Sequence, residues 1–183
     1  ASPHRCPGIP TPSSPYGVTK LATEHLCRLY YENYVVPIVI LRYFTVYGPR
    51  GRPDMAVFKF TKMIKNKVPI TLFGYGQVKR DFTYISNIVE GTIRTFKKNL
   101  PNQFDIINLV RGSPELVIKV VKELEKNLGV KAKIKKRALP KGEPKITYAD
   151  ITKARELLNY KPKISIEEGL SRFVEWYKDF EKN

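Results

Sequence analysis

The chain has 183 residues, a length that favours one domain with enough material for its own core. Hydrophobic residues make up 42%, which is ordinary for a globular protein. The net charge of +16 is not ordinary, and it produces a field that attracts nucleic acid, acidic membranes or phosphorylated small molecules without choosing among them.

Cysteine content and hydropathy exclude several classes of protein. Cys6 and Cys27 are too few and too far apart for a disulfide framework or a cysteine metal set, which fits a reduced, cytoplasmic setting. The longest apolar run, 35–41, is broken by Pro37 and is too short to cross a bilayer. Residues 1–8 lack the apolar centre of a signal peptide, and the absence of an initial Met is compatible with a piece of a longer protein.

The first predicted elements are a loop, a helix and a strand. Residues 1–13 are rich in Pro, Ser and Gly and predict a loop, while Ser14 and Pro15 are good first residues for a helix over 15–33. Apolar residues cover most sides of this helix, so we expect it to be buried or covered by a partner. The β-branched run 37–44 predicts a buried parallel strand, and 47–54 predicts a loop.

The middle of the chain alternates between helices and short strands. We expect a helix over 55–66, strands over 70–73 and through 82–85 around a turn at 74–76, and a strand over 104–109. Asn87 and Glu90 resemble a capping box for a helix over 87–98. Ser113 and Pro114 predict the start of a helix that ends at Gly129.

The last part contributes an edge strand and two helices. Residues 132–137 predict an edge strand with exposed lysines. Asp150 is expected to cap a short helix that ends near Asn159, and Ser165 with Glu168 forms a capping box for a helix to about residue 180. Because strands alternate with helices, the predicted fold class is α/β.

Tyr16 and Lys20 form the first candidate site, because they lie four residues apart on one face of the first helix. A fixed ammonium favours the phenolate form of tyrosine and lowers its pKa, so the pair could move a proton on or off a sugar hydroxyl. The spacing alone equally fits a surface tyrosine beside a solvated lysine. Tyr75 and Lys79 repeat it within a turn, where no helix aligns them.

The surrounding residues favour the functional interpretation. Segment 11–24, TPSSPYGVTKLATE, resembles the active-site helix of the extended short-chain dehydrogenase/reductase family. Segments 41–50 (LRYFTVYGPR), 80–84 (RDFTY) and 148–154 (YADITKA) match in the same order. The resemblance is specific to nucleotide-sugar epimerases and dehydratases. It implies the C-terminal part of a Rossmann-like fold, with 1–54 belonging to the Rossmann domain and 55–183 mainly to the substrate-binding part, some of its segments returning to the Rossmann sheet.

The resemblance also implies a catalytic set that is incomplete in this sequence. Tyr16 would be the general base, Lys20 the ribose-binding cation that lowers its pKa, and Phe44 a contact of the NAD nicotinamide, although Phe44 equally fits a core strand. The phosphate-binding fingerprint G-x-G-x-x-G is absent, and that loop and the family's catalytic Ser or Thr would lie upstream of Ala1. We therefore expect the isolated chain to be an incomplete enzyme that binds NAD poorly.

Four further residues match substrate-binding positions of this family. The pattern around Thr45 and Arg52 resembles the UDP-glucuronate 4-epimerase branch, in which the residues at these two positions face the carboxylate of the sugar. The planar guanidinium of an arginine can bind a carboxylate through two hydrogen bonds. Phe73 would stack on uracil and Arg80 would bind the pyrophosphate. A solvated loop arginine and a core phenylalanine are the alternatives for Arg52 and Phe73.

One segment departs from the family pattern, and the histidines suggest no metal site. The family pattern Arg-x-Gly-Asp is here Lys-Gly-Glu-Pro at 141–144, so a second phosphate-binding arginine is lacking and Lys141 would have to replace it. His4 and His25 share no metal-ligand spacing, and no metal site is predicted.

The resemblance implies a UDP-sugar 4-epimerase for UDP-glucuronate or UDP-glucose, in which bound NAD transiently oxidises C4. Family members commonly form homodimers through the active-site helix, and we expect the same here. A 4,6-dehydratase is the nearest alternative, and an inactive remnant or a basic binding module is the alternative from another class. Nucleic acid is disfavoured because no recognised nucleic-acid motif is present and the aromatic residues lie mainly in apolar segments.

Overall fold

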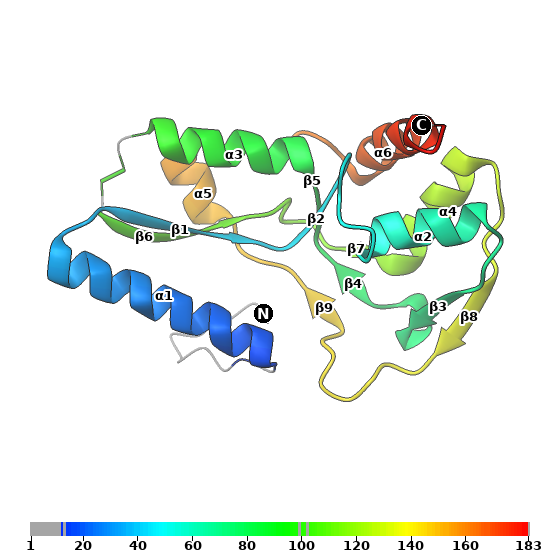
Figure 1. Cartoon of the computed structure of the whole chain (residues 1–183), viewed down its shortest axis with the longest axis horizontal. Coiled ribbons are helices and arrows are strands. Elements are labelled where there is room, and N and C mark those ends of the chain that lie inside the picture. The colour runs from blue at the N-terminus through cyan, green and yellow to red at the C-terminus, as the bar shows by residue number, and fades with distance from the viewer. Residues whose placement is uncertain (1–11, 13, 99, 102, 183) are drawn as a thin grey trace.

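Parallel strand pairs flanked by helices make up this protein, in agreement with the expected α/β class (Figure 1). The computed structural model describes residues 12, 14–98, 100–101 and 103–182. The expected loop at 1–13 therefore lies almost wholly outside the described residues.

The first part of the fold is a two-stranded parallel sheet between two helical layers. β1 (Ile38–Tyr43) pairs with β6 (Phe104–Leu109). α1 (Pro15–Tyr34) lies on one face, and α3 (Ile85–Lys97) and α5 (Thr152–Leu158) lie on the other (Figure 1). Ile107, Leu109 and Tyr160 are fully buried beneath α3 and α5. Among the described strands β6 is the one partner of β1, whose other edge is open.

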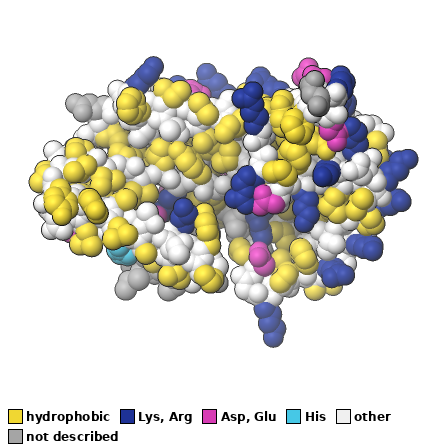
Figure 2. All heavy atoms as spheres, viewed as in Figure 1, with side chains coloured by type: hydrophobic (Ala, Val, Ile, Leu, Met, Phe, Trp, Pro, Cys, Tyr) yellow, Lys and Arg dark blue, Asp and Glu magenta, His cyan; other side chains and the backbone are white. Residues whose placement is uncertain are grey.

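α1 begins as the sequence predicts but is not buried. The Ser14 hydroxyl accepts a hydrogen bond from the Gly17 N–H, and Pro15 occupies the first helical position. No residue of this helix is buried. Its side chains that are more than half exposed include six large apolar ones: Tyr16, Val18, Leu26, Leu29, Tyr30 and Tyr34. Hydrophobic side chains are visible over this end of the molecule in Figure 2. Of the two expectations for α1, burial is wrong within the described chain, and a covering partner stays a prediction.

The second part of the fold has its own aromatic core. It contains β2 (Thr45–Tyr47) paired in parallel with β5 (Phe82–Tyr84), and β3 (Ile70–Phe73) paired in parallel with β8 (Ile134–Arg137). α2 (Ala56–Lys65), α4 (Val117–Leu128) and α6 (Ile166–Phe180) cover these strands. Phe58 of α2 meets Phe173 and Tyr177 of α6 edge to face, with ring centroids 6.1 and 5.3 Å apart.

A small three-stranded sheet joins segments that are distant in sequence. β4 (Lys79–Arg80) lies between β7 (Glu115–Leu116), which is antiparallel, and β9 (Ile146–Thr147), which is parallel. The central strand β4 follows the one-turn 3-10 helix η1 (Gly74–Gly76) in the chain. The pairing of β7 corrects the predicted start of the fourth helix: α4 begins at Val117 because residues 115 and 116 are used in the sheet.

The predicted capping pair at the start of α3 is also corrected. The helix begins at Ile85, two residues before Asn87, and its N-cap residue Tyr84 makes no side-chain cap bond. The buried Asn87 side chain instead accepts hydrogen bonds from the Lys163 and Ile164 N–H groups and donates to the Ile164 carbonyl. Asn87 therefore fixes the segment before α6. At α6 the N-cap bond of the expected box is confirmed, with the Ser165 Oγ 3.2 Å from the Glu168 N–H nitrogen, while the return bond from the Glu168 side chain stays a prediction.

Candidate functional site

Tyr16 and Lys20 project from the first turns of α1, and both are exposed. The Lys20 Nζ lies over the Tyr16 ring, 5.5 Å from its centroid. A cation at this distance is attracted by the ring and stays beside the phenol. The helix therefore aligns a phenol and a cation on an exposed surface.

Arg52 lies in the loop between β2 and α2. Its Nε and Nη2 atoms donate to the two carboxylate oxygens of Asp54, at 3.0 and 2.5 Å. The bond to Asp54 is the main cause that raises the pKa of the Arg52 guanidinium, and the Tyr16 phenol contributes to the same shift. The guanidinium of Arg52 is thus already in the fork geometry that binds a carboxylate.

Thr45 and Phe44 lie where the chain passes from the first part of the fold to the second. Thr45 opens β2 opposite Phe82 of β5 and is partly buried. Phe44 lies between β1 and β2 and packs against the core beneath α3 and α5. Core packing alone accounts for the Phe44 side chain here, and a contact with a cofactor stays a prediction.

Arg80 is held firmly by the backbone. Its Nη1 donates to the carbonyl oxygens of Lys79 and Pro144, each at 2.9 Å, and Nη2 lies 3.4 Å from a Glu143 carboxylate oxygen. Burial lowers the pKa of this guanidinium, and Glu143 opposes that shift. The side chain is therefore a preorganised cation whose remaining donors can receive an anion.

Phe73 ends β3 directly opposite Arg137 of β8. Its side chain is 47% exposed, so core packing does not account for it. Tyr75 in the following turn is 59% exposed and has a φ of +56°. These two rings offer flat surfaces on which a base could stack.

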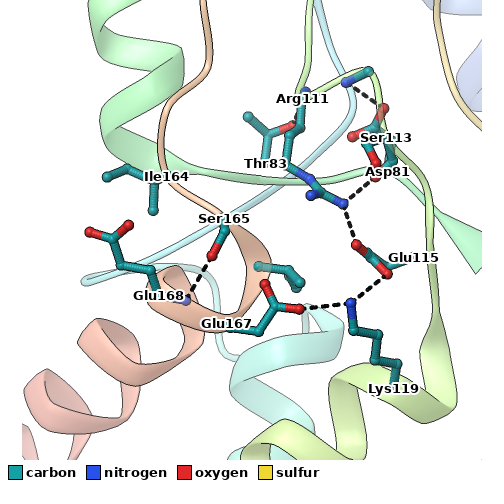
Figure 3. Close-up of polar contacts among 12 residues, drawn as sticks. Asp81, Thr83, Arg111, Ser113, Glu115, Lys119, Ile164, Ser165, Glu167 and Glu168 are labelled. Atoms are coloured by element: carbon teal, nitrogen blue, oxygen red, sulfur yellow. Dashed lines mark hydrogen bonds and ion pairs between the residues drawn. The ribbon is translucent and has the colours of Figure 1, made fainter.

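Figure 3 shows a charged network that sequence reasoning missed; it begins at Asp81, the residue after Arg80. The fully buried Asp81 carboxylate accepts from the Gly112 N–H at 2.9 Å, and burial raises its pKa. Arg111 bonds to Glu115 at 2.8 Å, and Lys119 lies between Glu115 and Glu167, at 3.1 and 2.7 Å. The network ties the end of β6 to α4 and α6. Arg111, Glu115 and Lys119 are each four residues apart, a spacing that indicates ion pairs on one helix face. Only Lys119 lies in α4, so the helix does not account for the whole set.

No metal cluster or membrane span was found in the described part of the chain. Its His, Cys, Asp and Glu residues contain no group of three that could hold a metal ion, which covers His25 but not His4. No helix among residues 14–182 combines the length and apolar character needed to cross a bilayer.

The α/β fold with parallel strand pairs is that of part of an NAD-dependent epimerase/dehydratase of the Rossmann type. The model of the family described as GDP-mannose 4,6 dehydratase matches residues 9–173. The chain therefore belongs to that family.

Individual relatives are similar to the chain over nearly all of its length. A UDP-glucuronate 4-epimerase of Thermodesulfobacterium geofontis is 47% identical over 172 residues, which cover 93% of this chain and 52% of the relative. The structure of the Bacillus cereus UDP-glucuronic acid 4-epimerase with UDP-glucuronic acid and NAD matches with a TM-score of 0.88 and 41% identity, over 98% of this chain and 57% of that one. A Thermotoga maritima UDP-glucose 4-epimerase with UDP-glucose matches with a TM-score of 0.86, 31% identity, and coverage of 94% and 56%. The chain spans about half the length of these relatives.

Proposed function

We propose that this chain is the substrate-holding, C-terminal portion of a UDP-sugar 4-epimerase, with UDP-glucuronate as the favoured substrate and UDP-glucose as the second candidate. The observation that carries the proposal is the Tyr16–Lys20 pair, in which the Lys20 Nζ lies 5.5 Å from the Tyr16 ring centroid on the exposed first turns of α1. Arg52 adds a guanidinium fork that already binds a carboxylate, that of Asp54, through two donors. Relatives named UDP-glucuronate 4-epimerase support the same assignment.

In this proposal Tyr16 removes the proton of the sugar 4-hydroxyl and later returns it. Lys20 holds the cofactor ribose and stabilises the phenolate. Both side chains are exposed on one face, so the first turns of α1 fit such a role. When bound, NAD supplies the redox chemistry, accepting hydride from C4 and giving it back to the other face of the sugar. Phe44 is assigned to the nicotinamide end.

The remaining residues bind the substrate. Arg80 receives the pyrophosphate, since its guanidinium is already fixed by two carbonyl oxygens. Phe73 stacks on uracil, and Thr45 with Arg52 selects the group at C6. Residues 1–54 then belong to the dinucleotide-binding part and 55–183 mainly to the substrate-binding part.

The exposed apolar face of α1 supports a homodimer through this helix. We also place the protein in the cytoplasm, where nucleotide sugars and reduced cysteines would meet. Sedimentation equilibrium at increasing concentration tests the assembly. A strictly monomeric profile would contradict the homodimer and leave the substrate assignment unaffected.

The activity is tested with a chimeric enzyme in which the dinucleotide-binding half of the Bacillus cereus relative precedes this chain. We expect it to interconvert UDP-glucuronate and its C4 epimer, and we expect Tyr16→Phe to remove turnover while UDP-glucuronate still binds. Conversion of UDP-glucose alone would favour the second candidate. A 4-keto-6-deoxy product would show a dehydratase instead, and a Tyr16→Phe enzyme with full activity would refute the role of Tyr16.

A further inference from the structure

Arg52 does not have a free guanidinium, because Asp54 occupies it. The two Asp54 oxygens meet Nε and Nη2, which is the side-on, bidentate geometry that a substrate carboxylate would use. The two residues lie in one loop and both side chains are more than half exposed, so the pair can open without disturbing the core. No other hydrogen bond of the Arg52 side chain was found within the described residues.

Arg80 provides the contrast. Two backbone carbonyl oxygens hold its Nη1, and Glu143 contacts only Nη2 at 3.4 Å. An anion can approach Arg80 without breaking the bonds that position it. At Arg52 a carboxylate must first displace Asp54, because the same two donors serve both.

We infer that Asp54 is a specificity-determining residue, which competes with the C6 carboxylate of the sugar for the fork of Arg52. The inference rests on the proposed function. For a sugar with a C6 carboxylate, the binding free energy gained at Arg52 is only the difference between the bonds that the sugar forms and the Asp54 bonds that it displaces. A sugar with a C6 hydroxymethyl group carries no charge with which to displace Asp54, so its affinity does not depend on that exchange.

The charge at position 54 therefore lowers the preference for an acidic sugar. Exposed ion pairs are weak because water and salt screen them, so we expect the removal of Asp54 to strengthen UDP-glucuronate binding roughly two- to fivefold. UDP-glucose binding should stay unchanged. The diphosphate is common to both ligands, so a general gain in positive charge would strengthen both equally.

The test is calorimetric titration of the 183-residue chain with UDP-glucuronate and with UDP-glucose. The variants are Asp54→Asn and Asp54→Ala. The matched control is Glu32→Gln, which also removes one negative charge but lies near the far end of α1, where Glu32 pairs with Arg28. We expect the two Asp54 variants to raise the ratio of the two affinities, and the control to leave it unchanged.

The outcomes separate this inference from the proposed function. If the chain binds UDP-glucuronate and the Asp54 variants leave the ratio unchanged, the inference is wrong and the proposed function stands. If the Asp54 variants and the control change both affinities alike, only long-range charge acts and the inference is also wrong. If the unmodified chain binds neither ligand, the substrate-holding role fails and the inference fails with it.

Discussion

Glu24 on α1 accepts two hydrogen bonds from the Arg42 guanidinium on β1, at 2.7 and 2.5 Å. Glu24 lies two helical turns after Tyr16 and one after Lys20, on the same side of the helix. The pair therefore fixes the rotation of α1, and with it the direction of the proposed catalytic side chains. This attachment matters because α1 has no buried residue to hold it.

The first prediction concerns that attachment. Glu24→Gln should loosen α1 from β1 and destabilise the fold by about 1 kcal/mol, the upper end for a partly exposed ion pair. Hydrogen exchange of the α1 amides should become faster, while exchange in α2 and α6 should not change. Glu32→Gln is the control, since its pair with Arg28 lies within the helix. Equal acceleration in both variants would show that Glu24 does not fix the helix.

The second prediction concerns Asn87, which joins α3 to the segment before α6. Asn87→Ala should lower the free energy of unfolding by about 1–3 kcal/mol, because it leaves the Lys163 and Ile164 backbone groups without their partner. Urea denaturation measures the loss, with the neighbouring exposed Ser86→Ala as the control. A loss no larger than that of the control would refute a structural role for the buried amide.

The third prediction is that the stability of the fold falls at acidic pH because the Glu167 carboxylate binds Lys119. Its bond to Glu167 lowers the pKa of that carboxyl from 4.5 to about 2. The folded pKa is the lower one, so the stabilisation is present above about 4.5 and is lost as the pH falls towards 2. The Glu167 side chain is 46% exposed, so screening keeps the effect below about 1 kcal/mol. Glu167→Gln should flatten the fall in stability over this range, measured by denaturation at several pH values. Glu175→Gln on the exposed side of α6 should not.

The fourth prediction concerns substrate choice in the chimeric enzyme. Arg52→Ala should reduce kcat/KM for UDP-glucuronate roughly 3- to 50-fold, the loss expected for a hydrogen bond to a charged group less the two- to fivefold that competition by Asp54 already removes, and should spare UDP-glucose. Arg80→Ala should reduce kcat/KM for both substrates, because the pyrophosphate is common to them. The ratio of the two kcat/KM values is the measurement. If the unmodified enzyme prefers UDP-glucose and Arg52→Ala leaves the ratio unchanged, the glucuronate assignment is replaced by the glucose one.

Local sequence signals determined the elements whose ends are fixed by neighbouring residues. Ser14 and Pro15 gave the start of α1, Gly129 in the left-handed conformation gave the end of α4, and Ser165 gave the start of α6. The resemblance of the motifs also identified candidate catalytic and substrate-binding residues, namely Tyr16, Lys20, Arg52 and Arg80. These features depend on interactions a few residues apart, which a sequence pattern records directly.

Tertiary structure decided the features that depend on partners distant in sequence. Asn87 caps no helix because residues 163 and 164 offer it better hydrogen bonds, and α4 starts late because β4 uses residues 115 and 116. α1 is apolar yet exposed because its exposure depends on what lies next to it, and not on its own periodicity. Only the fold shows that Asp54 occupies the guanidinium of Arg52. Hydrogen bonding and burial at such positions are set by which surfaces meet, and that is a property of the assembled chain.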